Sequence, residues 1–185
     1  MKRIATAVLA AVSLAAMTVA AAGAASTTTI SGTVTGGTAL SVTPNGTPGF
    51  ALTLNGIDQV ATYTLPVEAI DPRGTGAGWN LTITSTQYSA GAGRRFAANA
   101  STIASASSGC GPSSTCTTAT NSVAYAGFVL PAGITPPTAV KFFNAGAASG
   151  LGKVDVNAAI SVAVPANAYA GTYTSTVTVS IVAGP

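Results

Sequence analysis

The chain has 185 residues, of which 48% are hydrophobic and only 6% are charged, and it contains no histidine. Its formal charge of +3 falls to +1 without Lys2 and Arg3, because five basic residues then face four acidic ones. A balance this close to neutral argues against nucleic acid as a partner. The lack of histidine removes the Ser-His-Asp and Cys-His arrangements and the usual zinc sites.

Residues 1–25 have the pattern of a secretory signal peptide. A short basic start precedes an uncharged apolar run, and the small residues AAGAAS follow. The alternative is a retained membrane anchor, because the run approaches the roughly 20 residues that a spanning helix needs. Its weakly hydrophobic, Ala-rich makeup favours cleavage near Ala24 or Ala25. We therefore expect a secreted, extracellular protein with one domain at 26–185 and no membrane span after cleavage.

Apolar residues alternate with hydroxyl residues along much of this domain, which is typical of strands with one buried face. Pro66 interrupts one such segment and places it at a sheet edge or a bulge. Between residues 89 and 152 the alternation is weaker. Strands are expected in residues 27–34, 38–43, 49–54, 60–70, 78–88, 122–131, 137–145, 153–165 and 172–182.

The last two segments have the clearest alternation. Even positions from Val154 to Val164 form one apolar face, and odd positions from Tyr173 to Ile181 form another. The turn formers PANAYAG join them, which predicts a hairpin with a long connection. Six to nine short antiparallel strands in a secreted chain of this size indicate an all-β, immunoglobulin-like β-sandwich.

Little in the sequence indicates catalysis or cofactor binding. Cys110 and Cys116, six positions apart in an exported chain, are expected to form a disulfide that pins the tip of a hairpin or long loop. No calcium-loop spacing occurs among the four acids, and we expect Asp71 to accept hydrogen bonds from amides of its own turn. The glycines at 74–78 lack the helix and the Lys-Ser or Lys-Thr pair of a phosphate loop. We expect no enzyme activity, no metal and no cofactor.

The only tryptophan, Trp79, directly follows this glycine-rich loop. Strand alternation places Trp79 and Leu81 on one face and Asn80 on the other. In one interpretation, the indole is a core plug, and the glycines allow the loop to pass close over it. In the other, an exposed indole stacks on a sugar ring, assisted by Arg73.

The run from Asp71 through Arg73 and the glycines to Trp79-Asn80-Leu81 resembles the proximal motif of the WxL-domain cell-surface proteins of Gram-positive bacteria. That family has a second motif near the C-terminus, a Tyr followed by a short strand ending in Thr-Trp-x-Leu. Tyr173 begins the corresponding segment here, with Val179 in place of Trp and Ile181 in place of Leu.

The resemblance implies a compact β-sandwich held non-covalently on the wall. Its partner would be peptidoglycan or another cell-wall polymer, often within a complex of other surface proteins. The binding residues it implies are Arg73, Trp79, Asn80, Leu81 and Tyr173.

An alternative function is a structural subunit of an extracellular fibre or pilus-like assembly. The Thr-rich segment STTTISGTVTGGTALSV at 26–42, broken by Gly36-Gly37, has a strand pattern that signal cleavage would free. Such a segment can be donated to a second copy of the chain. It can equally be the first strand of the protein's own sheet.

Overall fold

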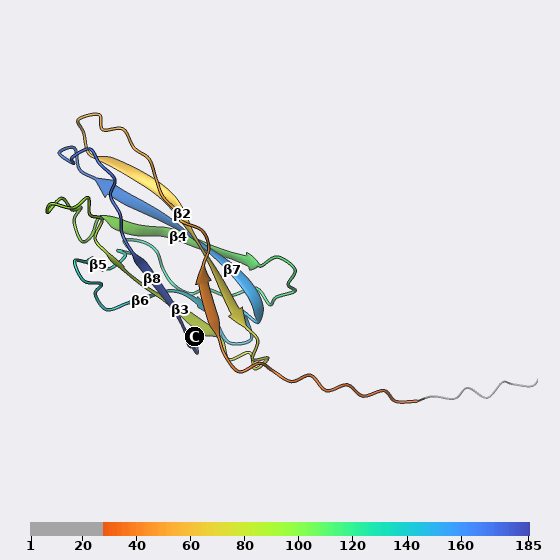
Figure 1. Ribbon diagram of the computed structural model, residues 1–185. Coiled ribbons are helices and arrows are strands. Elements are labelled where there is room, and N and C mark those ends of the chain that lie inside the picture. Colours follow the sequence, from red (N-terminus) through yellow and green to blue (C-terminus); the bar gives the residue numbers. More distant parts are fainter. Residues whose placement is uncertain (1–27) are drawn as a thin grey trace, which may run out of the picture. The chain divides into compact units, whose positions relative to one another are not determined.

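The computed structural model describes residues 28–185 (Figure 1). The expected signal peptide at 1–25 lies outside the described residues. Residues 34–185 form one compact unit. Residues 28–33 fall outside that unit and contain no helix or strand.

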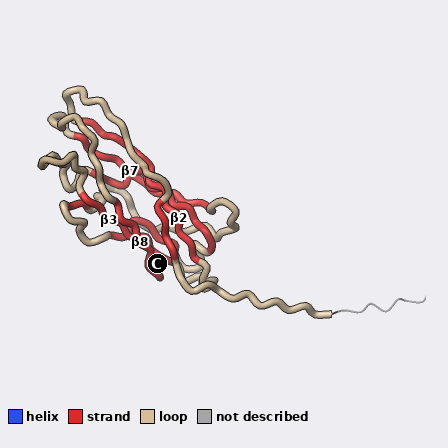
Figure 2. Tube along the Cα trace, viewed as in Figure 1, coloured by secondary structure: helices blue, strands red, loops and turns tan. Residues whose placement is uncertain are grey.

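Strands joined by loops make up the compact unit, with no helix among residues 34–185 (Figure 2). The described part of the chain contains no helix that is long and apolar enough to cross a membrane. The strands are β1 (Ser41–Pro44), β2 (Gln59–Asp71), β3 (Trp79–Thr86), β4 (Ser101–Cys110), β5 (Ala132–Gly133), β6 (Val140–Ala145), β7 (Gly152–Val164) and β8 (Val177–Ala183).

These strands form two sheets. One has the order β1-β2-β7-β4, and in the other β3 pairs with β6, β5 and β8. Every pairing is antiparallel except the two-residue contact between β3 and β5. This confirms the expected all-β, antiparallel, sandwich-like fold. The immunoglobulin-like topology stays a prediction.

The core follows the predicted alternation along β7. All even positions from Val154 to Val164 are buried, as are Trp79, Leu81 and Ile83 on β3. Odd positions from Tyr173 to Ile181 point inward as expected, but they are only half-buried because β8 lies at the edge of its sheet.

The expected C-terminal hairpin is wrong. β7 pairs along its whole length with β2 and over most of it with β4, whereas β8 pairs with β3 in the other sheet. Both edges of β7 are therefore occupied, and the connection at 165–176 crosses between sheets. Alternation predicts which face of a strand is buried, but not which strand lies beside it.

Three of the other expected strands are absent from the described residues. Residues 28–34 have no strand pairing, and 122–131 contributes only an isolated bridge between Val129 and Thr102. Residues 49–54 keep their alternation, with Phe50 and Leu52 half-buried, but have no strand beside them. β4 was not predicted because its last seven residues, ASASSGC, carry only small side chains.

Pro66 marks the point where β2 becomes an edge strand, as predicted. β1 pairs with β2 only between Val67 and Ile70. Beyond that ladder, the Asn45 N–H donates to the Pro66 carbonyl at 2.9 Å. Because proline has no N–H to place on this side, it suits the end of the ladder. Residues 59–65 pair with β7 alone.

Candidate functional site

Asp71 and Arg73 form an ion pair that braces the turn after β2. Arg73 Nε donates to Asp71 Oδ1 and Nη2 donates to Oδ2, both at 2.8 Å. The Arg73 backbone N–H also donates to Oδ1, which confirms the expected turn. These hydrogen bonds hold the pKa of the buried Asp71 carboxyl below its usual range. Arg73 Nη2 further donates to the Gly78 carbonyl at 2.8 Å, so its guanidinium is engaged within the turn.

Trp79 is a core plug, and the interpretation of an exposed indole is wrong. Its side chain is fully buried, its ring centroid lies 5.9 Å from that of Phe143, and its indole N–H donates to the Gly150 carbonyl at 2.9 Å. The glycine that lies against the indole comes from the loop before β7, not from residues 74–78. A Cβ on Gly150 would overlap the side chain of Ala145 and lie 2.7 Å from the indole nitrogen.

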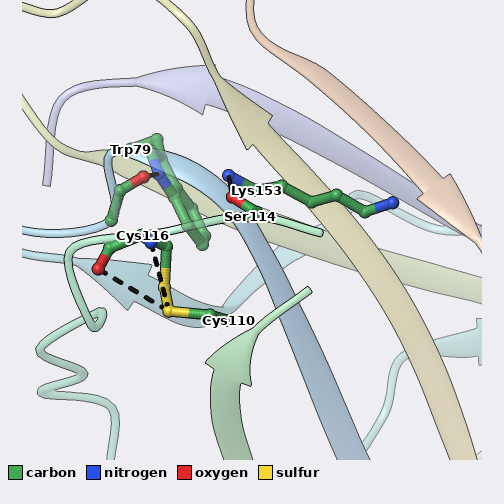
Figure 3. The surroundings of a disulfide bond; sticks show 6 residues. Trp79, Cys110, Ser114, Cys116 and Lys153 are labelled. Carbon is green, nitrogen blue, oxygen red and sulfur yellow. Dashed lines mark hydrogen bonds between the residues drawn. A yellow bond between two sulfur atoms is a disulfide. The ribbon is translucent and has the colours of Figure 1, made fainter. Parts of the chain in front are cut away.

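The expected disulfide between Cys110 and Cys116 is confirmed, with 5.3 Å between the Cα atoms. It closes the loop after β4, beside Trp79 and the start of β7 (Figure 3). Directly after it, Thr117 donates its N–H to the Leu151 carbonyl and accepts from the Gly150 N–H at 2.8 Å. The disulfide thus holds the segment that presents Gly150 to the indole.

Asn80 and Leu81 also have structural roles. Leu81 is fully buried, while Asn80 donates through Nδ2 to the Gly184 carbonyl at 2.6 Å. Leu81 lies opposite Ile181, and Ile83 lies opposite Val179. The two segments that carry the WxL resemblance are therefore neighbouring strands of one sheet.

Tyr173 lies apart from the other four candidate residues. Trp79 pairs with Ala183 at one end of the β3–β8 ladder, whereas the chain around Tyr173 continues past the other end, where Thr174 bridges Ser89. The five residues do not form a single site.

Tyr173 instead belongs to an open cavity of about 890 Å³, which we call the aromatic groove. Tyr173 stacks on Phe96 with 4.2 Å between ring centroids. Deeper in, the Tyr88 hydroxyl donates to the Tyr63 hydroxyl at 3.3 Å, and burial raises the pKa of both phenols. Six of the ten Phe and Tyr residues line the groove: Phe50, Tyr63, Tyr88, Phe96, Tyr169 and Tyr173.

Two arginines border the same end of the molecule. The Arg94 guanidinium lies 4.4 Å from the ring centroid of Tyr169, a cation–π geometry. Arg94 and Arg95 line an adjoining cavity of about 490 Å³ that shares Phe96, Tyr169 and Tyr173 with the groove. Ion pairs among the described residues involve Arg73 and Lys153, so both arginines keep their charge available.

This groove was not predicted because its lining comes from separate segments. Its aromatic residues lie at 50, 63, 88–96 and 169–173, and no single window contains more than a few of them. The only local signal was the run Gly-Arg-Arg-Phe at 93–96, which places two cations beside an aromatic ring.

Within residues 28–185, no group of three or more Cys, Asp or Glu side chains is placed to hold a metal ion. Comparison with protein-family models, with curated proteins and with solved structures found no match to the chain. The WxL resemblance therefore rests on the two short motifs alone.

Gly150→Ala tests the close approach to Trp79. The matched control is Gly127→Ala, because Gly127 (φ +69°) has the same backbone conformation as Gly150 (φ +73°) but open space around its Cβ position. Overpacking typically costs about 1–3 kcal/mol, so we expect Gly150→Ala to lower the free energy of unfolding by that much more than the control. Urea denaturation followed by Trp79 fluorescence measures both losses. Equal losses would contradict the proposed crowding.

Asp71→Asn tests the buried ion pair through pH. Because the pKa of Asp71 is lowered in the folded state, the pair stabilises the protein above the unfolded value of about 3.9 and this contribution is lost as pH falls below it. We expect Asp71→Asn to lower Tm at pH 7 and to flatten the decline of Tm between about pH 4 and pH 2. Parallel Tm profiles for the two proteins would show that the pair contributes nothing.

Replacing both cysteines by serine tests the disulfide. A loop this short is expected to contribute about 2 kcal/mol, so the variant should lose about that much in a urea titration. A reducing agent added to the wild type should reproduce the loss and leave the variant unchanged. A variant as stable as the oxidised wild type would rule out a stabilising role.

Proposed function

We propose that the protein is a secreted, non-catalytic surface protein that attaches non-covalently to the cell wall through the aromatic groove. Peptidoglycan is the proposed ligand. The observation that carries this proposal is the gathering of aromatic rings beside two available arginines at one end of the sandwich.

The chemistry of the groove suits a glycan that carries carboxylates. Tyr169 is 62% exposed and Tyr173 is half-buried, so both can offer ring surface to the apolar faces of sugars. Tyrosine hydroxyls supply hydrogen bonds at the rims of these rings. Arg94 and Arg95 can pair with carboxylates of the wall peptides in bidentate geometry.

The lining favours binding over hydrolysis. Cleavage of a glycosidic bond generally requires two carboxyl groups on either side of it. The residues that line the groove and its adjoining cavity include no Asp or Glu.

The WxL resemblance supports the same function, although through different residues. Trp79 and Leu81 are buried and Arg73 is held by Asp71, so we assign these residues to the scaffold. Of the residues that the resemblance implied, Tyr173 is the one we place in the binding surface. A wall-bound surface complex is a further partner compatible with this attachment.

Co-sedimentation of the chain from residue 26 onward with purified peptidoglycan sacculi tests the proposal. We expect the wild type to sediment and Tyr169→Ala to bind about tenfold more weakly, the effect of losing about 1.4 kcal/mol at an aromatic contact. Ile134→Ala, at a 72% exposed position outside the groove lining, is the control and should bind like the wild type.

Sacculi stripped of their attached anionic polymers distinguish the two wall ligands. Binding that survives stripping identifies peptidoglycan, whereas binding that disappears identifies the anionic polymer and makes peptidoglycan the wrong ligand. A folded wild type that stays in the supernatant with both materials would overturn wall attachment.

A further inference from the structure

The segment 28–34 has the pattern of a strand, and it takes part in no strand pairing among the described residues. Ile30 is 91% exposed and Val34 is 99% exposed. In an extended conformation these two side chains share one face with Gly32, and Thr29, Ser31 and Thr33 occupy the other. A β-prone segment of this kind is suited to pairing with an open sheet edge.

The first half of β2 provides such an edge. Pro66 directs its carbonyl towards β1, and strand geometry gives Val60, Thr62 and Thr64 the same orientation. Their backbone groups therefore point away from β7 and lie beyond the end of the β1 ladder. The opposite edge of the sheet is partly covered, because residues 128–130 exchange hydrogen bonds with the start of β4.

The segment that packs near this edge is not paired with it as a strand, although Phe50 stacks on Tyr63. Residues 47–54, which we call the flap, pack on the core through Phe50 and Leu52. Among the described residues, the flap makes no backbone–backbone hydrogen bond to residues 59–65. Its one hydrogen bond to this edge is accepted by the Thr53 carbonyl from the Gln59 side-chain amide at 3.2 Å. It is bounded by Gly46 (φ +71°) and Gly56 (φ +86°), neither of which has a neighbouring atom within 4 Å of its Cβ position. Both glycines can therefore act as hinges.

The segment and the edge are complementary. Both are seven residues long, about 23 Å in extended form. The outward face of the edge carries Thr62 and Thr64, which suits the threonines of the segment as cross-strand pairs. On the inward face, antiparallel pairing of the two segments would place Ile30 beside Tyr63 and Val34 beside Gln59. Parallel pairing would place Ile30 beside Ala61 and Val34 beside Leu65. Tyr63 and Leu65 line the 890 Å³ groove, so either pairing adds an apolar side chain to its wall.

A chain cannot bring its own segment to its own edge. The Gly37 N–H donates to the Pro72 carbonyl at 2.8 Å, and a Cβ on Gly36 would overlap the Arg73 carbonyl, so this part of the chain is anchored at the far end of β2. Val34 is three residues from Gly37 and can extend about 11 Å. Leu65, the near end of the open edge, is seven strand residues from Pro72, or about 23 Å.

We propose that residues 28–34 of one copy add as a strand to the edge at residues 59–65 of a second copy, with the flap moving aside at Gly46 and Gly56. Because the segment and the edge lie at different places on each copy, the contact is head-to-tail and extends into chains of subunits. This self-association goes beyond wall attachment and does not depend on it.

Hydrogen exchange with a peptide of residues 26–36 tests the edge directly. At saturating peptide, and at a protein concentration low enough to keep the full mature chain monomeric, we expect exchange of the Thr62 and Thr64 amides to slow by about 100-fold. The Ala61 and Tyr63 amides, which face β7, are the internal reference and should not change. A peptide with Ile30→Asp and Val34→Asp should give no protection. One with Thr29→Asp and Thr33→Asp carries the same charge on the other face and should still protect.

Light scattering of the mature chain over a range of concentrations tests assembly. We expect the wild type and the Thr29→Asp/Thr33→Asp variant to form growing oligomers, and the Ile30→Asp/Val34→Asp variant to stay monomeric. Because these positions lie outside the core, all three proteins should have the same Tm. A monomeric wild type that also shows no peptide protection would overturn the proposal, as would oligomers that form equally well in the Ile30→Asp/Val34→Asp variant. Sedimentation of the Ile30→Asp/Val34→Asp variant with and without sacculi measures wall attachment apart from assembly, so the two proposals fail separately.

Discussion

The buried indole N–H of Trp79 needs an acceptor, and its bond to the Gly150 carbonyl organises one end of the sandwich. An unpaired donor at this depth would cost about 1–3 kcal/mol. The approach is close enough that the acceptor residue must be glycine. Gly150 is in turn held by Thr117, which follows the Cys110–Cys116 disulfide. β7 begins two residues after Gly150, so the same contact positions the first residues of one of the two inner strands of its sheet.

The Asp71–Arg73 ion pair also fixes the position of Trp79, through the turn that precedes Trp79 in the chain. Arg73 holds the Gly78 carbonyl directly before the indole, and the turn it braces also anchors Gly36 and Gly37. A buried ion pair is costly unless all its hydrogen bonds are made, and here both carboxylate oxygens are satisfied. The motif residues thus join the N-terminal segment, the turn after β2 and the indole into one closed end. We infer that they mark a scaffold and not a ligand contact.

Features that depend on residues close together in the sequence were predictable, and features that depend on distant segments coming together were not. Alternation in β2, β3 and β7 arises within single segments, so these strands, their buried faces and the edge at Pro66 were predictable. The Cys110–Cys116 spacing gave the disulfide for the same reason. The pairing of β8 with β3 depends on which edges β7 leaves open, and that is a property of the whole sheet. The aromatic groove was hidden in the same way, because Phe50, Tyr88 and Tyr169 meet only after folding. Trp79 was conspicuous because it is unique, which indicated importance but not exposure.

The two ends of the sandwich differ in how their polar and aromatic groups are used. At the Trp79 end, the indole N–H, the Asp71–Arg73 ion pair and the two cysteines all find their partners within the chain. At the groove end, Tyr169 and two arginines keep exposed or unpaired groups, and the edge of β2 keeps free backbone donors and acceptors. Groups that are already bonded within the chain gain little from a partner, whereas exposed groups can exchange their bonds to water for bonds to a partner. We therefore expect both the wall ligand and a second copy of the chain to bind at the groove end. The contacts around Trp79 serve the scaffold.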